Sequence, residues 1–186
     1  MIFLLRHGQI KDSKKKRYIG RTDIPLDDTG ILQAEYWQKI FSIIKINRIL
    51  SSSLSRCFNT AKTIAGKQEI MITPELNEID MGAWDGLSFE QIKNNHPKEF
   101  EKRGKNLDSF IPPRGESFYD LSCRTIPLFN QINNNLQGNA LIITHAGVIR
   151  TILCHIQNIK LKNLFQIKIA YGELFVLGSA SNKKKI

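Results

Sequence analysis

Short apolar runs alternate along this chain with longer stretches of helical periodicity. Four runs have the length of buried strands: residues 2–5, 48–51, 140–144 and 174–177. In residues 29–45, apolar side chains recur at three- and four-residue steps and form one stripe on a predicted helix. Strands that alternate with helices in this way are typical of the α/β class.

Capping and stop residues predict the other helices. One is expected from Ser55, which can cap free amides, to about Ala65, where Gly66 follows, and another begins at about Ser88. Residues 116–136 predict a helix that Pro127 kinks or ends early. A last helix is expected over residues 146–156.

The segment 94–115 interrupts this regular pattern with prolines and glycines. We expect an irregular excursion with about one helical turn, which could form part of a lid over a site. Because the chain shows no internal repeat and no linker, and 186 residues with 41% hydrophobic content suffice for one core, residues 1–186 are predicted to form a single domain.

The charge balance favours anionic partners. Lys and Arg exceed Asp and Glu by 27 − 17 = +10, but much of the excess lies in Lys14–Arg17 and Lys183–Lys185, which are expected to be solvated. No run approaches the ~20 apolar residues of a membrane span, and Arg6 comes too early for a signal-peptide core. We therefore expect a soluble, cytoplasmic protein.

Three widely spaced cysteines, Cys57, Cys123 and Cys154, have no metal-type spacing. Their odd number suits a reducing compartment and neither a disulfide framework nor a zinc site. All three are predicted to be structural.

Candidate chemistry begins where the first strand ends, at Arg6-His7-Gly8. Arginine offers a planar fork of donors to phosphate oxygens, and a neutral imidazole offers a lone pair that can attack phosphorus. Gly8 leaves room for an anion.

The strand at 140–144 repeats this arrangement, because it delivers His145 at its end, close to Gly147. The carboxyl ends of strands in open α/β sheets are where ligands bind, so His7 and His145 would face one another if their strands are neighbours. The following helix would then direct its free amides at an anion.

Two more segments add charge to this picture. The strand at 48–51 leads to Arg56 at a helix start, and residues 75–86 carry four carboxylates beside two glycines. One carboxyl group there could be a general acid. The general acid could be Glu78, and four other carboxylates are chemically able to act in its place: Glu75, Asp80, Asp85 and Glu116.

Together, these blocks resemble the histidine phosphatase superfamily, in its phosphoglycerate mutase-like branch. The resemblance rests on Arg6-His7-Gly8, on Ser51 to Arg56 followed by Thr60-Ala61, on Glu78 with the Gly82–Gly86 segment, and on Thr144 to Gly147. It implies a three-layer α/β/α sandwich around a mostly parallel sheet. It also implies phosphoryl transfer through a phosphohistidine, with no metal and no cofactor.

The resemblance assigns roles residue by residue. His7 matches the nucleophile, Arg6 and Arg56 the phosphate clamps, His145 the second histidine, and Glu78 the acid/base group. Substrate contacts are expected from Arg6, Arg56, His145, Gly8, Gln9, Thr22 and Gly147.

Within the superfamily, the segment from Tyr18 to Leu26 and the ending Tyr171-Gly172-Glu173-Leu174 are most similar to α-ribazole phosphatases. Mutase-type members usually carry Glu after Arg-His-Gly and Asn four residues further on, where this chain has Gln9 and Ser13. These departures argue against a mutase and leave the monoester open.

The predicted function is therefore a phosphomonoesterase, with α-ribazole 5′-phosphate as the expected substrate. A broad-specificity, sugar-phosphate or phosphoserine phosphatase is the alternative among enzymes. A non-catalytic phosphate- or nucleic-acid-binding module is the alternative from another class, although no aromatic-interleaved basic patch supports nucleic acid. The oligomeric state is left open.

Overall fold

The computed structural model describes residues 1–178 and, as backbone only, residues 183–185. Its centre is one six-stranded sheet with the order β3-β2-β4-β1-β5-β6. The first four of these strands run parallel, and β5 is antiparallel to β1. The strands are β1 (Ile2–Arg6), β2 (Arg48–Ser51), β3 (Ile70–Ile72), β4 (Ala140–Thr144), β5 (Leu174–Leu177) and β6 (Lys183–Lys185).

The central strands bury both of their faces, which explains their nearly continuous apolar sequences. Because side chains alternate along a strand, Ile2 and Leu4 of β1 belong to one hydrophobic cluster, and Phe3 and Leu5 belong to another. The two clusters lie on opposite faces of the sheet, and each requires a covering layer of helices.

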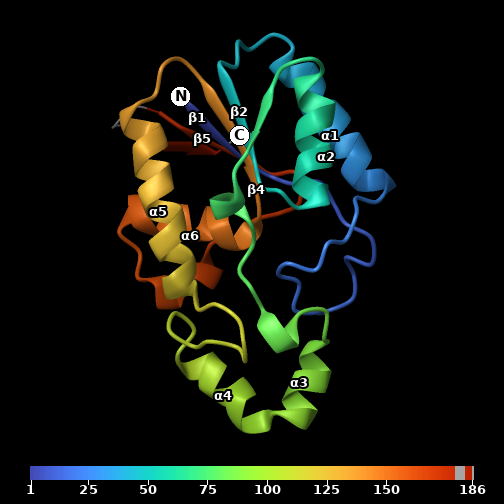
Figure 1. Cartoon of the computed structure of the whole chain (residues 1–186), viewed down its shortest axis with the longest axis vertical. Helices are drawn as coiled ribbons and strands as arrows, with labels where there is room; N and C mark the ends of the chain where they lie inside the picture. The colour runs from blue at the N-terminus through green and yellow to red at the C-terminus, as the bar shows by residue number, and fades with distance from the viewer. Residues whose placement is uncertain (179–182, 186) are drawn as a thin grey trace.

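Helices supply these two layers (Figure 1). On one side lie α1 (Asp28–Phe41) and α2 (Ser55–Ala65), whose buried residues Trp37 and Ile64 join the second cluster. On the other side lie α5 (Phe118–Asn134) and α6 (Ala146–Gln157), which pack on the first cluster. The chain therefore has the expected α/β/α sandwich around a mostly parallel sheet.

A separate lobe stands beyond the carboxyl ends of the parallel strands, at the bottom of Figure 1. It contains α3 (Phe89–Asn95) and α4 (Pro97–Lys105). Ser88 caps α3 through a reciprocal pair of hydrogen bonds with Gln91, and Pro97 stands at the start of α4, where its missing N–H costs nothing. The prediction of a mostly irregular segment was thus wrong for residues 97–105.

Two further local predictions were wrong in whole or in part. Pro127 does not end α5, which continues to Asn134, and the predicted kink stays a prediction. The proline leaves the Cys123 carbonyl without its helical partner, and Cys123 is exposed, so water can serve it. Ser55 does not cap α2, because its hydroxyl and amide both donate to Asp23 instead.

Three short 3₁₀ segments, η1 (Pro74–Leu76), η2 (Gly82–Trp84) and η3 (Leu161–Gln166), complete the elements. The sequence pattern missed strands β3 and β6. β3 is apolar but only three residues long, shorter than the four predicted runs, and β6 is a run of lysines without an apolar pattern. Within the described residues, no helix has the length and apolar character needed to cross a membrane.

Candidate active site

The register of the central strands brings the two histidines together. Arg6 at the end of β1 lies opposite Thr144 at the end of β4, so the next residue of each strand is a histidine. The ring centroids of His7 and His145 are 5.1 Å apart. The neighbouring strand ends thus place the pair as the sequence predicts.

His7 is a buried imidazole that is held in its neutral form. Its Nδ1 lies 2.7 Å from the Gly8 carbonyl oxygen, so Nδ1 carries the proton and the Nε2 lone pair is left free. The ring is only 4% exposed. Burial, followed by the charges of Arg6 and Arg56, lowers the pKa of His7 well below its ordinary value of 6.5.

His145 is completely buried, and both of its nitrogens have partners. Its Nδ1 accepts from Arg56 Nε at 3.3 Å, and its Nε2 lies 2.8 Å from the Ser52 hydroxyl, which in turn donates to Asn77 at 2.7 Å. Burial, Arg56 and His7 lower the pKa of His145 well below 6.5. The neutral ring therefore accepts from Arg56 and orients it.

Arg56 occupies the first turn of α2 and is 1% exposed. Its two Nη atoms donate to the carbonyls of Gly20 and Thr22 at 2.7 and 2.8 Å. That loop is itself held by the Asp85 carboxylate, which accepts the amides of Gly20, Arg21 and Thr22. A buried guanidinium needs such partners, and here they aim it at the histidine pair.

Arg6 lies on the other side of His7. Its guanidinium stacks on the Tyr171 ring at 3.6 Å and donates to the Ile169 carbonyl at 2.9 Å. Tyr171 also lies 5.6 Å from the His7 ring, centroid to centroid. Two guanidiniums therefore flank the imidazole, and both retain N–H donors for an anion.

Glu78 faces the same place from the loop after η1. One of its carboxylate oxygens accepts the Gly147 amide of α6 at 3.1 Å, and the other accepts the Ile79 amide at 3.0 Å. A Cβ atom at Gly147 would lie 2.2 Å from this carboxylate. Gly147 thus both donates to Glu78 and leaves the space that the carboxylate occupies.

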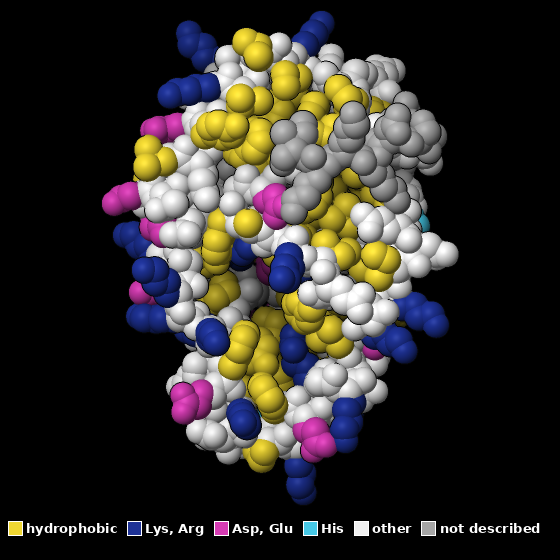
Figure 2. Space-filling model, turned by 180° about the vertical axis from the view of Figure 1, so that it is seen from behind, with side chains coloured by type: hydrophobic (Ala, Val, Ile, Leu, Met, Phe, Trp, Pro, Cys, Tyr) yellow, Lys and Arg dark blue, Asp and Glu magenta, His cyan; other side chains and the backbone are white. Residues whose placement is uncertain are grey.

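A cavity of about 640 Å³ opens beside these groups and extends toward the α3–α4 lobe. Arg6, Glu78 and Gly147 line it near the histidines, and Phe89, Phe100 and Arg103 line it from the lobe. Figure 2 shows this face hollowed between the body and the lobe, with Lys and Arg side chains around hydrophobic ones. The cavity connects the catalytic candidates to a larger, mixed apolar and basic wall.

Comparison with known proteins agrees with this geometry. The family model of the histidine phosphatase superfamily (branch 1) matches residues 2–186. The chain belongs to this superfamily.

One relative is the 6-phosphofructo-2-kinase/fructose-2,6-bisphosphatase of Arabidopsis thaliana, 31% identical over 172 residues. The match takes in 90% of this chain and 23% of that protein, so this chain spans about a quarter of its length. The adenosylcobalamin/alpha-ribazole phosphatase of Salmonella typhimurium is 23% identical over 175 residues, which are 92% of this chain and 86% of that one. The crystal structure of the alpha-ribazole phosphatase from Shigella flexneri has the same fold, with a TM-score of 0.86, 22% identity, and coverage of 94% and 88%.

In this histidine phosphatase, Gly8, Gln9 and Thr22 are not among the residues that line the cavity, and neither are His7, Arg56 and His145, so their contacts with a substrate stay a prediction. The Gln9 side chain donates to Asp27 at 2.9 Å, and Thr22 contributes its carbonyl to Arg56. Gly8 donates to Thr60 at 3.2 Å and packs so closely on Gly30 that a Cβ would lie 2.4 Å from its carbonyl oxygen. These residues support the site from behind.

The alternative carboxylates have other partners. Asp85 holds the Gly20–Thr22 loop, Asp80 accepts from the Gly82 amide at 2.8 Å, and Glu116 pairs with Arg124 at 3.0 Å. Glu75 is exposed and does not line the cavity. Among these candidates, Glu78 alone lines it.

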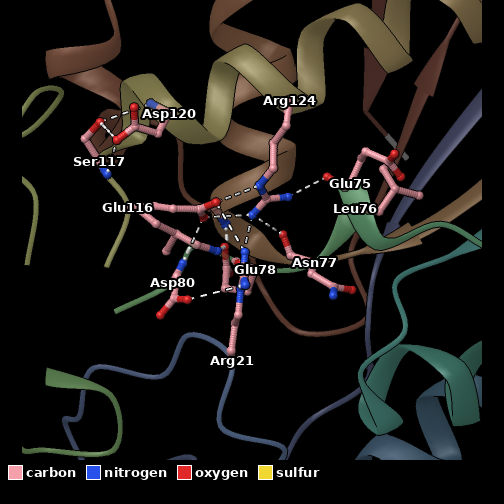
Figure 3. Close-up of polar contacts among 12 residues, drawn as sticks. Arg21, Glu75, Leu76, Asn77, Glu78, Asp80, Glu116, Ser117, Asp120 and Arg124 are labelled. Atoms are coloured by element: carbon pink, nitrogen blue, oxygen red, sulfur yellow. Dashed lines mark hydrogen bonds and ion pairs between the residues drawn. The ribbon is translucent and has the colours of Figure 1, made fainter. Parts of the chain in front are cut away.

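The cluster that holds Glu78 in place could not be foreseen from the sequence. Arg124 of α5 donates to the carbonyls of Glu75, Asn77 and Glu78 at 2.6, 2.9 and 3.1 Å, and to both oxygens of Glu116 (Figure 3). Burial acts to raise the pKa of Glu116, but hydrogen bonds from Arg124 and the Asp80 amide outweigh it, and that pKa is lowered. Nothing in the sequence around Arg124 indicates that its side chain donates to backbone carbonyls of another segment.

Cys57 was also missed as a neighbour of the site. Its Sγ lies 3.3 Å from His145 Nε2, and burial raises the pKa of its thiol. The thiol therefore stays protonated and fills space behind the histidine. Among the described residues, no group of three or more His, Cys, Asp or Glu is arranged to hold a metal ion.

Proposed function

We propose that this chain hydrolyses phosphomonoesters through a phosphohistidine at His7, and that α-ribazole 5′-phosphate is its substrate. One observation carries the first part. A neutral imidazole with a free Nε2 lies between two guanidiniums, one of which, Arg6, lines the cavity together with Glu78. Phosphoryl transfer depends mainly on positioning and charge neutralisation, which this arrangement provides.

In the first step, His7 Nε2 attacks phosphorus in line while Arg6, Arg56 and His145 hold the equatorial oxygens. His145 would exchange the present contact of its Nε2–H with Ser52 for a phosphate oxygen, while its Nδ1 still accepts from Arg56. As the P–O bond breaks, a protonated Glu78 gives its proton to the leaving alkoxide. The products are an alcohol and a phosphohistidine.

In the second step, the Glu78 carboxylate takes a proton from a water molecule, which attacks the phosphohistidine. The N–P bond breaks, the lone pair returns to His7, and inorganic phosphate leaves. Glu78 is again protonated, so acid and base alternate in one residue.

The choice of substrate has two supports. An α-ribazole phosphatase shares the fold, and a relative that acts on adenosylcobalamin and α-ribazole phosphates aligns over 92% of this chain. The cavity is also far larger than a phosphate needs. We place the reaction in the cytoplasm, where the three free cysteines would remain reduced.

A phosphoserine phosphatase is the second candidate, since a protein described as such in Hydrogenobacter thermophilus is 27% identical over 168 residues. The first test is phosphate release, without added metal, from α-ribazole 5′-phosphate, phosphoserine and sugar phosphates. We expect α-ribazole 5′-phosphate to exceed the others by at least tenfold in kcat/KM, and His7→Ala to abolish turnover on all. Similar values across the panel would reject the substrate, and salt-sensitive nucleic-acid binding without turnover would favour the binding module.

A further inference from the structure

The cavity wall also carries exposed aromatic rings. Phe89 and Phe165 both line it, and their side chains are 41% and 48% exposed. Tyr18 packs on Phe89 with ring centroids 4.5 Å apart, and Phe118 meets Phe165 edge-on at 5.8 Å. The exposed faces leave apolar surface available to a ligand.

Two arginines without an ion pair in the described residues share this wall, although the Glu78 carboxylate is near enough to Arg150 to oppose the lowering of its pKa by burial. The Arg103 guanidinium lies 5.1 Å from the Tyr18 ring centroid and 6.0 Å from that of Phe165, and it makes no hydrogen bond or ion pair within the described part of the chain. Arg150 lies 5.1 Å from the Phe165 centroid and donates only its Nε, to the Ile167 carbonyl at 2.9 Å. Both retain N–H donors on a wall of the cavity.

Three other cations of the cavity wall differ from these two, whereas exposed Lys16 is a fourth that also has no ion pair within the described residues. Lys15 and Arg17 pair with Asp12 at 3.1 and 3.6 Å, and Arg6 belongs to the phosphate clamp. Arg103 and Arg150 therefore add donors beyond those that the transferred phosphate needs.

We infer that Phe165, Phe89, Arg103 and Arg150 form a subsite for a planar heteroaromatic group in the leaving alcohol. Such a group covers apolar ring faces, stacks on guanidinium planes, and accepts hydrogen bonds at its edge nitrogen. A small anionic alcohol, such as serine or glycerate, would satisfy the arginines but leave the phenylalanine rings uncovered. The inference rests on the proposed function. It identifies the part of the cavity that would distinguish one phosphomonoester substrate from another.

Two esters that differ only in the ring system test the subsite. α-Ribazole 5′-phosphate and ribose 5-phosphate share the reacting group and the sugar, so the ratio of their kcat/KM values isolates the base. We expect Phe165→Ala and Arg103→Met each to lower kcat/KM for α-ribazole 5′-phosphate at least tenfold and that for ribose 5-phosphate less than twofold. Lys102→Met, which removes a charge from the exposed side of the same helix, should change neither.

Binding of the free alcohols separates this inference from the proposed function. By calorimetry, we expect the wild type to bind α-ribazole at least tenfold more tightly than ribose, and both variants to lose this preference. Equal losses on both esters, or unchanged binding in the variants, would overturn the subsite even if phosphate release persists. Absence of phosphate release with the preference intact would overturn the catalytic proposal alone. Because Phe165 and Arg103 occupy separate elements, one variant remains informative if the other fails to fold.

Discussion

Two glycines beside the histidines show how a missing side chain serves the site. Gly8 allows the backbone after His7 to lie against Gly30, and Gly147 allows the Glu78 carboxylate to reach the first turn of α6. A Cβ atom at position 8 would meet the Gly30 backbone, and one at position 147 would meet the Glu78 carboxylate. The glycines thus fix the positions of the nucleophile and of the proposed acid.

Gly147→Ala separates these effects on activity from those on stability. Alanine favours a helix over glycine by about 1 kcal/mol, but its Cβ would displace the Glu78 carboxylate. We expect kcat to fall at least tenfold while the free energy of unfolding changes by less than about 1 kcal/mol. Steady-state kinetics and urea unfolding measure the two quantities.

Gly104→Ala is the matched control, because Gly104 is also helical and nothing lies within 4 Å of the position that a Cβ atom would take there. It should gain up to about 1 kcal/mol of stability and leave kcat unchanged. Full activity in Gly147→Ala would show that Glu78 does not need its present position.

For single residues, the sequence predicts which side chains lie at the site better than it predicts which groups they contact. His7, His145 and Arg56 follow strands of recognisable length, so their meeting at one edge of the sheet could be foreseen. The roles of Ser52 and Tyr171 could not, since each depends on the direction of a side chain. Only the folded backbone determines which ring nitrogen or guanidinium they meet.

Among the elements, α5 has the clearest influence on the site although it does not carry a catalytic candidate. Its Arg124 donates to three carbonyls of the loop that presents Glu78. The loop has no regular hydrogen bonding of its own between η1 and η2. Its conformation therefore depends on contacts with other segments, among which Arg124 makes three hydrogen bonds to its carbonyls.

Arg124→Ala should disturb that loop. Removing the guanidinium takes the Arg124 hydrogen bonds from three carbonyls and from Glu116, which keeps only Arg21 and the Asp80 amide, so we expect a loss of about 2–3 kcal/mol in the free energy of unfolding. We also expect kcat to fall at least tenfold, with partial recovery in Arg124→Lys. Urea unfolding and steady-state kinetics provide the measurements.

Arg48→Ala serves as the comparison, since Arg48 donates to a single exposed carbonyl, that of Asn135. Its loss should lower the free energy of unfolding by less than about 0.5 kcal/mol and leave kcat unchanged. If Arg124→Ala kept full kcat despite the lost stability, the cluster would hold the fold and not the orientation of Glu78.

Element predictions succeeded where periodicity or caps were strong. The boundaries of α2 and the start of α3 agree with the Ser55, Gly66 and Ser88 signals, although Ser55 uses its side chain elsewhere. Pro127 does not end the helix early, because an exposed helix face tolerates the lost hydrogen bond. That residues 94–115 act as a lid stays a prediction.

For the molecule as a whole, the buried histidines link stability to pH. An unfolded chain gains protons on both residues as pH falls below their ordinary value of 6.5, whereas burial and the nearby arginines keep them neutral in the folded state. Since the unfolded state then binds more protons, stability is lost as pH falls from 6.5 toward the lower folded values. Each histidine contributes up to about 1.4 kcal/mol per pH unit in that window.

Urea unfolding of wild type and His7→Gln between pH 7.5 and 5 tests this linkage. The variant should show a shallower decline, by about 1.4 kcal/mol per pH unit. Equal slopes would mean that His7 takes up its proton in the folded state as readily as in the unfolded chain.

Fold class and family were predictable from the sequence because four strand runs and four motifs occur in a consistent order, and the sandwich and the superfamily are both confirmed. The cavity was not, since its wall combines the loop of residues 11–27, the α3–α4 lobe and η3. Because these segments are far apart in the sequence, no local sequence pattern predicts the cavity that they form together.

The pairing of β1 with β4 also governs when the site can form during synthesis. His7 leaves the ribosome long before the strand that completes its surroundings, Ala140–Thr144, which is made only after α5. Until then the first strand lacks a neighbour on either side, because β5 is made later still. A nascent chain arrested before residue 140 should therefore expose β1 to chaperones and have no means of taking up phosphate from an ester.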